Sequence, residues 1–372
     1  MEIMKRITIW LALCLLLASC RNVDTKKEHN SNAQDTLAIS SAVREDIPPI
    51  ETGEFTIDDS DFGATIDLKG EPVPVNHIFK VQETQMLALS NLLLVKNRNP
   101  NKMFMAFTLP DLKFIKDFGE QGKGPFEFKY PTLVKNFESN PLCYVHDNGH
   151  LFYIDEDCEV VPAKIELPYM TYRGDLQMYS FSDSLFYYID NTSKGKAILR
   201  YEIDQDTSSV HQVHDLAFSQ RHSNWASYIG DLGASKEYAR LVYAYKYFRR
   251  ITFMDTEGEQ IRTLTFKTKD TKAGTNVEML APDNVTHYWG ISPQKNHVYF
   301  LYSGRTPIEV HNENRDSSGY IFVEQFDWNG NPIRRFKLDH WGYFCVSHDE
   351  TMIYQFSNTE IHPIVKYQLP AL

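Results

Sequence analysis

The chain has 372 residues, 42% of them hydrophobic, and its formal net charge is −11 at pH 7. This acidic balance excludes an extended nucleic-acid surface, because phosphate binding draws on clustered lysine and arginine side chains. The arginine pairs at 249–250 and 334–335 lie within strand-like segments, and we interpret them as solvated strand faces.

An apolar stretch at residues 7–18 follows two basic residues and is too short to span a bilayer as a stable helix. It predicts a secretory signal peptide over residues 1–19. The tetrapeptide LASC, which ends at Cys20, resembles a bacterial lipobox and predicts lipidation of that cysteine. The alternative is an ordinary signal peptide that has a cysteine near its end. We therefore expect a lipoprotein of the outer membrane, facing either the periplasm or the cell exterior.

Residues 20–50 are rich in Asn, Ser, Thr and charged side chains and contain no aromatic residue. Such a segment buries too little apolar surface to offset its ordering entropy, so we predict a flexible tether. The folded part is expected over residues 51–372. Its length of about 320 residues allows one large repeat domain or two ordinary ones.

The rest of the chain reads as short apolar or alternating strands separated by Asp, Asn, Gly and Pro, with 21 tyrosines and 23 phenylalanines. This pattern predicts an all-β repeat protein. Residues 253–264 form a strand, an acidic turn with glycine and a second strand, and residues 326–336 repeat this unit. Aspartate and glycine make such hairpin turns tight. Weaker copies begin at Leu109, Tyr153, Tyr201 and Phe356.

These six hairpins recur at intervals of roughly 30 to 70 residues, which favours a six-bladed β-propeller of four-stranded antiparallel blades. The alternative, a β-helix, repeats at much shorter intervals. We expect Phe55–Leu68 to close the ring beside the last blade, which removes free sheet edges. The expected blades are 76–118, 132–167, 178–216, 228–266, 287–338 and 343–369.

Several of these features together resemble the TolB-like six-bladed propeller lipoproteins of Bacteroidetes. They are the lipobox with its polar tether, the segment FGEQGKGPFEF at 118–128, and the late blades at 288–304 and 321–356. Such proteins usually have Gly-x-Gly-Pro-Gly-Glu-aromatic in the glycine segment, whereas Phe126 stands here in place of the third glycine. The resemblance covers nearly the whole mature chain. It implies the fold and an envelope location and says little about activity.

The glycine segment does not have the form of a phosphate loop. A Walker loop needs GxxxxGK followed by Ser or Thr at the start of a helix, whereas strand-like residues follow here. The order GxxGxG also differs from the dinucleotide fingerprint. We therefore predict a blade-connection loop that contains Gly119, Gly122, Gly124, Pro125 and Glu127, and we expect no nucleotide and no cofactor.

Propeller hydrolases and lactonases gather acidic and histidine side chains around the central channel, where a divalent metal activates water. Spacing alone does not show that any two candidates in this sequence face one channel, and each also fits a turn. We predict neither a metal site nor catalytic residues, and we keep a metal-dependent hydrolase as the alternative. The candidates are His146, Asp147, His150, His287, His297 and the segment 348–350.

Three cysteines remain in the expected fold, and none has the CxxC spacing of a zinc site. A disulfide bond between Cys143 and Cys158 across a hairpin is one alternative. We expect these two residues and Cys345 to be buried and reduced.

Trp289 and Trp341 lie near predicted strand starts and are candidate ligand contacts at one mouth of the channel, together with His146 and His287. Flat aromatic rings stack on sugars, but they also pack between blades. Trp225 and Trp328 have the same two interpretations. Residues 222–239 depart furthest from a strand pattern and are expected to form a loop over one face.

The leading hypothesis is a non-catalytic binding or protein-interaction module of the bacterial envelope, with an envelope protein or a glycan as partner. It follows from the lipobox, the repeated hairpins and the lack of a convergent catalytic motif. The alternatives are the metal-dependent hydrolase or lactonase and a glycan-binding propeller.

Overall fold

The computed structural model describes residues 51–371, apart from positions 76, 78, 81–83, 98–100, 125, 171–176, 206, 220–227 and 268–283. The expected signal peptide and tether, and with them Cys20, lie outside the described residues. The described part is almost entirely β-structure, with one α-helix, α1 (Pro307–Arg315), and one 3₁₀ helix, η1 (Asp59–Phe62). None of its helices is long and apolar enough to cross a lipid bilayer.

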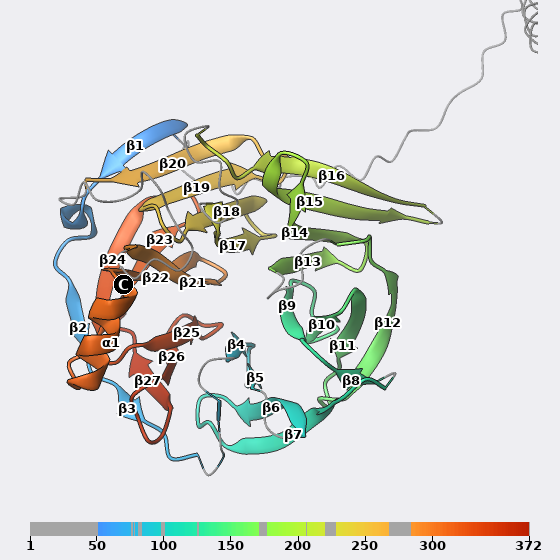
Figure 1. Ribbon diagram of the computed structural model, residues 1–372, viewed down its shortest axis with the longest axis horizontal. Coiled ribbons are helices and arrows are strands. Elements are labelled where there is room, and N and C mark those ends of the chain that lie inside the picture. The colour runs from blue at the N-terminus through green and yellow to red at the C-terminus, as the bar shows by residue number, and fades with distance from the viewer. Residues whose placement is uncertain are drawn as a thin grey trace, which may run out of the picture. The chain divides into compact units, whose positions relative to one another are not determined.

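Six blades surround a common centre, as the repeated hairpins predict (Figure 1). The first strand of each blade faces this centre and contacts the first strand of the next blade, and the sixth contacts the first. Numbered in chain order, the inner strands of blades 1 to 6 are β4 (Gln85–Ala88), β9 (Thr132–Asn136), β13 (Met178–Ser182), β17 (Gly230–Ser235), β21 (Thr286–Pro293) and β25 (Gly342–Val346).

The other strands of each blade follow outward from the centre in antiparallel order. The second strands are β5 (Leu92–Lys96), β10 (Cys143–Asp147), β14 (Leu185–Thr192), β18 (Arg240–Tyr245), β22 (His297–Arg305) and β26 (Met352–Ser357). The third strands are β6 (Lys102–Thr108), β11 (His150–Ile154), β15 (Gly195–Asp204), β19 (Arg250–Asp255), β23 (Ile321–Asp327) and β27 (Ile364–Gln368). Blades 1 to 5 have as fourth strands β7 (Phe114–Gln121), β12 (Val160–Glu166), β16 (Thr207–Asp215), β20 (Gln260–Phe266) and β24 (Pro332–Leu338).

Three of the predicted hairpins share one turn geometry. Asp155, Asp255 and Asp327 each use Oδ1 to accept hydrogen bonds from the backbone N–H groups two and four residues later, at 2.8 to 3.0 Å. Gly258 and Gly330 lie three residues after their aspartates with φ of 87° and 78°, a conformation that glycine adopts without strain. These turns therefore form by the mechanism that their sequence predicts.

The hairpin at Phe356 differs from the prediction that it is the outer hairpin of a blade. Asn358 lies between β26 and β27, so this hairpin joins the second and third strands of blade 6 and is not an outer hairpin. The fourth strand of blade 6 is β3 (Glu71–Pro72), which comes from the other end of the domain. Six blades are nevertheless correct, because the N-terminal segment completes the sixth.

This N-terminal strap, residues 53–72, gives strands to three blades (blue in Figure 1). β1 (Gly53–Ile57) pairs parallel to β20, β2 (Ile66–Leu68) pairs parallel to β24, and β3 pairs antiparallel to β27. The expectation that Phe55–Leu68 pairs with the last blade is therefore wrong. The physical reason is η1, which docks against blades 4 and 5 and directs the chain along their outer edges before it reaches blade 6.

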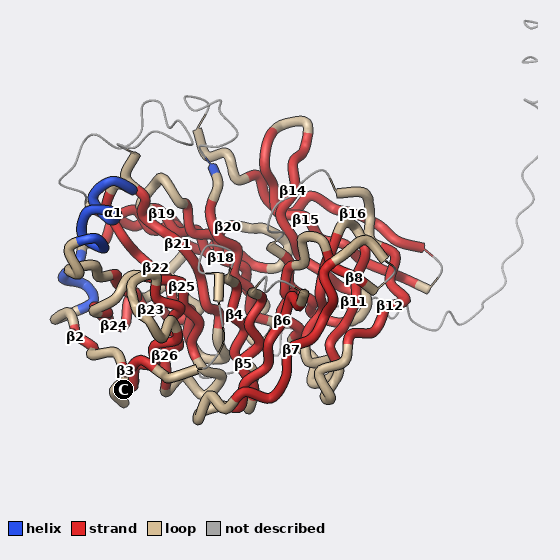
Figure 2. The backbone as a smooth tube through the Cα atoms, turned by 60° about the horizontal axis from the view of Figure 1, so that its bottom comes forward, coloured by secondary structure: helices blue, strands red, loops and turns tan. Residues whose placement is uncertain are grey.

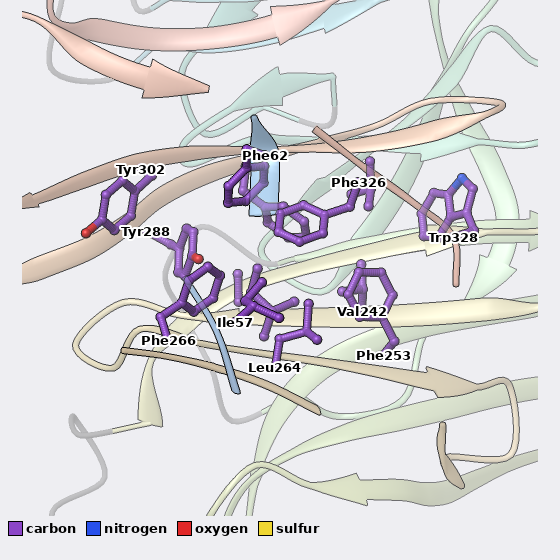
Figure 3. Packing of buried hydrophobic residues seen from close by; sticks show 14 residues of the cluster. Ile57, Phe62, Val242, Phe253, Leu264, Phe266, Tyr288, Tyr302, Phe326 and Trp328 are labelled. Carbon is purple, nitrogen blue, oxygen red and sulfur yellow. The ribbon is translucent and has the colours of Figure 1, made fainter. Parts of the chain in front are cut away.

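The strap belongs to the hydrophobic core between blades 4 and 5. Figure 3 shows Ile57 and Phe62 of the strap among Val242, Leu264 and Phe326. The rings of Phe62 and Phe326 meet edge to face, with centroids 5.2 Å apart. Full burial of a side chain of this size stabilises a fold by about 1.5–3 kcal/mol, so the strap contributes to stability by packing as well as by strand pairing.

A buried ion-pair network fixes the strap. Glu324 is fully buried; its Oε1 lies 2.9 Å from Arg249 Nη2, and its Oε2 accepts a hydrogen bond from the Tyr288 hydroxyl at 3.1 Å. Arg249 also reaches Asp59 at 2.6 Å, and Arg335 reaches the second oxygen of Asp59 at 2.7 Å. Burial alone would lower the pKa of Arg249, but the Glu324 carboxylate raises that pKa above its ordinary value. We call this network the strap latch.

The latch corrects the interpretation of the arginine pairs as solvated faces. The side chains of Arg249 and Arg335 are only 6% and 7% exposed. The guanidinium of Arg249 also stacks on the Tyr302 ring, 4.2 Å from its centroid. The local sequence gives no sign of this burial, because Glu324 lies 75 residues from Arg249 along the chain.

Residues 222–239 are a further correction. Positions 220–227 lie outside the described residues, but Gly230–Ser235 forms β17, the inner strand of blade 4. A Cβ atom on Gly233 would lie 2.5 Å from the end of the Ile291 side chain, so a larger residue there would require this side chain to shift. Small residues weaken the hydrophobic pattern, which explains why the segment resembles a loop in sequence.

Asp59→Asn should lower the free energy of unfolding at pH 7 by about 1–2 kcal/mol, a modest loss because the carboxylate is 54% exposed and partly screened by solvent. Burial raises the pKa of Asp59, but Arg249 and Arg335 together hold it below its ordinary value of 3.8. Such a carboxylate stabilises the fold above that value and loses the effect as the pH falls through its folded pKa.

Urea unfolding of wild type and Asp59→Asn, measured from pH 7 into acid, should therefore show a difference that shrinks in acid. Asp67→Asn, at an exposed position of β2, is the control and should behave as wild type. A difference that stays constant into acid would show that the latch does not depend on the charge of Asp59.

Candidate functional site

The ring has two faces, because the strands of each blade alternate in direction (Figure 2). One face carries the connections between second and third strands and the connections from one blade to the next. We call it the top face. The bottom face carries the remaining connections. The top-face connections lie within residues 97–101, 122–131, 148–149, 167–177, 193–194, 216–229, 246–249, 267–285, 306–320, 339–341 and 358–363, as far as these are described.

Exposed apolar side chains gather on the top face. Ile361 is 93% exposed and Tyr169 is 81% exposed, and both lie on top-face connections. Among the described residues, no large exposed hydrophobic side chain lies on a bottom-face connection. Those on the top face are Phe126, Tyr130, Tyr169, Phe218, Ile308 and Ile361, whereas the remaining three, Phe114, Ile115 and Val210, lie on outer strands. The top face is therefore the apolar face of the ring.

The structure brings Trp289 and Trp341 together near this face. Trp289 lies on β21 and Trp341 directly precedes β25, and their rings meet edge to face with centroids 5.3 Å apart. The ammonium of Lys246 lies 4.4 Å from the centroid of the Trp289 ring, within the range of a cation–π contact. Neither indole nitrogen has a hydrogen-bond partner within the described residues. Both indole nitrogens are buried, but Trp289 as a whole is only half-buried, so part of its ring remains available to a ligand.

His287 lies two residues before Trp289 and is buried. Its ring stacks on Tyr302, and neither ring nitrogen has a partner within the described residues. Burial, and then the charge of Arg249, lower the pKa of His287 to about 3, so the imidazole is neutral. His146 lies elsewhere: it is on β10 of blade 2, and its Nε2 accepts a hydrogen bond from the Gly149 N–H at 3.2 Å. The two histidines therefore do not form one site.

Sequence reasoning missed a polar group at the same mouth. Asp231 on β17 accepts a hydrogen bond from the Gln177 side chain at 3.2 Å. Burial raises the pKa of Asp231 to about 6, and Lys246 opposes this shift. Burial also lowers the pKa of Lys246, with opposition from Asp231. The only signal in the sequence is an acidic residue at the start of an inner strand, which strand periodicity does not distinguish from a turn.

The other candidates have structural roles. His297 Nδ1 contacts Glu350 Oε2, and that carboxylate also accepts hydrogen bonds from Asn296 N–H at 2.7 Å and the Tyr299 hydroxyl at 2.9 Å. Asp147 accepts backbone hydrogen bonds from residues 129 and 130. Trp328 is buried and donates to the Gln294 carbonyl, whereas Trp225 lies outside the described residues. In the described ranges, no group of three or more His, Cys, Asp or Glu side chains is placed to hold a metal ion. Cys143, Cys158 and Cys345 are buried thiols without a disulfide.

Lys135 crosses the centre of the ring. It lies on β9 of blade 2, and its Nζ donates a hydrogen bond to the Pro293 carbonyl of the opposite blade 5 at 2.5 Å. Burial lowers the pKa of Lys135 to about 8, although the nearby Glu350 opposes the shift. Lys135 and Pro293 lie at the bottom ends of their strands, so their contact joins opposite blades on that side of the ring.

Lys135→Met should raise the free energy of unfolding at pH 7 by roughly 1–3 kcal/mol, because it replaces a buried ammonium by an apolar side chain of similar length. The pKa of Lys135 is about 8 in the fold and 10.5 otherwise. Its buried charge therefore lowers the stability of the fold fully below pH 8 and no longer above pH 10.5. The advantage of the variant should thus shrink between these pH values. Urea unfolding across this range tests it, with the exposed Lys129→Met as control; a gain independent of pH contradicts the assignment.

The glycine segment does bind an anion, but the anion is its own Glu127. Oε2 of Glu127 accepts hydrogen bonds from the backbone N–H groups of Lys123 and Gly124, both at 2.7 Å. β8 (Glu127–Phe128) then pairs parallel to β7, where Gly119 has a φ of 70°. These contacts agree with a blade-connection loop. Pro125 lies outside the described residues.

Gly122→Ala should lower the free energy of unfolding by roughly 1–3 kcal/mol, because the added Cβ would lie 1.8 Å from the bound Glu127 oxygen and expel the carboxylate. Glu127→Ala removes the same interaction, so the two losses should not add. Gly290→Ala is the control, since the nearest atom to its added Cβ lies 3.8 Å away. Denaturant unfolding of the single and double variants tests this, and additive losses would disprove the coupling.

The family model described as TolB-like 6-blade propeller-like matches residues 79–350 of the chain. A member of the DUF4221 family from Bacteroides vulgatus has a similar structure, with a TM-score of 0.55 and 12% sequence identity over 82% of this chain and 96% of that one. A protein of Bacteroides fragilis has a TM-score of 0.46 and 10% identity over 86% and 99% of the two chains. A gluconolactonase of Xanthomonas campestris has a TM-score of 0.42 and 10% identity over 83% and 98%. Comparison with curated proteins gives no match. At these identities the structural likeness shows the fold alone.

Proposed function

Because the chain belongs to the TolB-like six-bladed propeller family, we propose that it is a non-catalytic interaction module of the bacterial envelope whose top face binds a partner protein. The N-terminal leader and Cys20 support a lipid anchor in the outer membrane. The anchor keeps the ring at the membrane without a spanning segment.

The observation that carries the proposal is the one-sided exposure of apolar side chains. Six of the nine large exposed hydrophobic residues belong to top-face connections, and none belongs to a described bottom-face connection. Single exposed hydrophobic residues are ordinary, but their concentration on one face is typical of an interaction surface. Loops on a rigid ring are also where propellers place recognition, because the ring holds them without folding cost.

The proposal predicts face-specific contact in the native envelope. A photocrosslinking amino acid at Ile361 or Tyr169 should give a discrete adduct in cells, whereas one at Lys295, exposed on the bottom face, should not. Ile361→Glu should reduce the Tyr169 adduct severalfold, because a charge in an apolar contact is desolvated without a partner. Ile115→Glu, on the outer strand β7, is the matched control and should leave the adduct unchanged.

Equal adducts from both faces, or none from the top face, would overturn the proposal. Glycan binding is the second candidate, favoured by the half-buried ring of Trp289. In that case Trp289→Ala would abolish retention on a glycan, because it removes the ring, and Ile361→Glu would not affect it.

A further inference from the structure

A cavity of about 740 Å³ lies beside the glycine segment, between blades 1 and 2. This volume is in the range of pockets that hold small molecules. The lining comes from the segment itself, from the turn between β10 and β11, and from the outer strand β12. The function proposed above assigns no small ligand to this cavity, although Phe126 at its rim belongs to the top face.

Much of the lining of the cavity is apolar, and we call this part the floor. It comes from Leu151 and Phe152 of β11 and from Ala163 and Ile165 of β12. Phe126 lies at the rim and is 58% exposed. An apolar ligand body would cover these surfaces, and about 25 cal/mol is gained for each Å² removed from water.

The rim carries two ammonium groups and two carboxylates, and no ion pair joins them within the described residues. The carboxylates of Glu127 and Asp147 accept hydrogen bonds from backbone N–H groups instead, the first from Lys123 and Gly124 and the second from residues 129 and 130. The side chains of Lys123 and Lys129 are exposed. Both lysines therefore keep hydrogen-bond donors that the rim carboxylates do not use.

We propose that this cavity binds a small monocarboxylate with an apolar acyl body. The acyl body would lie on the floor, and the carboxylate would reach the ammonium groups of Lys123 and Lys129. A neutral apolar ligand would leave both cations unused, and a free inorganic anion would leave the floor exposed to water. Phe126 then has a role at the rim that a glycine at this position would not supply: its ring covers the acyl chain.

Isothermal titration of the mature chain, with Cys20→Ser so that neither lipid nor detergent is needed, tests the proposal. Octanoate should bind with a stoichiometry of one, 1-octanol about tenfold more weakly because it lacks the charged group, a difference of about 1.4 kcal/mol, and acetate not measurably because it lacks the acyl body. Octanoate that binds no better than octanol overturns the proposal, as does the absence of octanoate binding.

Variants locate the site. Lys123→Gln combined with Lys129→Gln should weaken octanoate about tenfold, to the level of octanol, and leave octanol unchanged. Lys113→Gln, an exposed lysine on the bottom face, is the matched control. Ala163→Leu should weaken both ligands by filling the floor. Octanoate affinity unaffected by the lysine pair overturns the proposal. These variants need no partner protein, so their outcome is separate from that of the crosslinking experiment.

Discussion

The strap latch is the interaction on which the ring depends. Glu324 is fully buried, and a buried carboxylate is tolerated only when cations and hydrogen bonds compensate for its lost hydration. Arg249 from blade 4 and Arg335 from blade 5 provide that compensation, and Asp59 of the strap joins both arginines. One network therefore ties two neighbouring blades to the segment that completes blade 6. The strand that completes blade 6 and the contacts that dock the strap on blades 4 and 5 thus belong to one continuous segment.

The sequence predicts the parts of this fold that repeat. The turns at Asp255 and Asp327 can be predicted from sequence, because the aspartate accepts hydrogen bonds from backbone N–H groups of the same turn and the glycine lies within five residues of it. The same logic fails where small residues replace the hydrophobic pattern, as in β17, and where a partner is distant, as for Arg249 and Glu324. The pairing of the strap cannot be predicted from the local sequence either. β1 pairs parallel to β20, and the paired residues lie about 200 positions apart along the chain.

The candidate site was predictable only in part for the same reason. Trp341 precedes β25 and Trp289 lies in the first half of β21, and topology alone places the starts of all inner strands at one mouth. Asp231 and Lys246 join them through the ring geometry, which no local pattern contains. The one-sided apolar exposure required the strand directions of every blade. A face is a property of the closed ring, so it appears only when all connections are assigned to one side.

The glycine segment shows how a backbone that suits an anion is used when no phosphate is bound. Successive N–H groups at Lys123 and Gly124 converge on one oxygen, which is the geometry of a backbone nest. Glu127 occupies that nest and so converts an anion site into a rigid blade connection. Because backbone N–H groups hold this carboxylate, the neighbouring Lys123 and Lys129 form no ion pair with it. A loop that excludes phosphate by supplying its own carboxylate thereby leaves two ammonium groups for the external carboxylate that we propose.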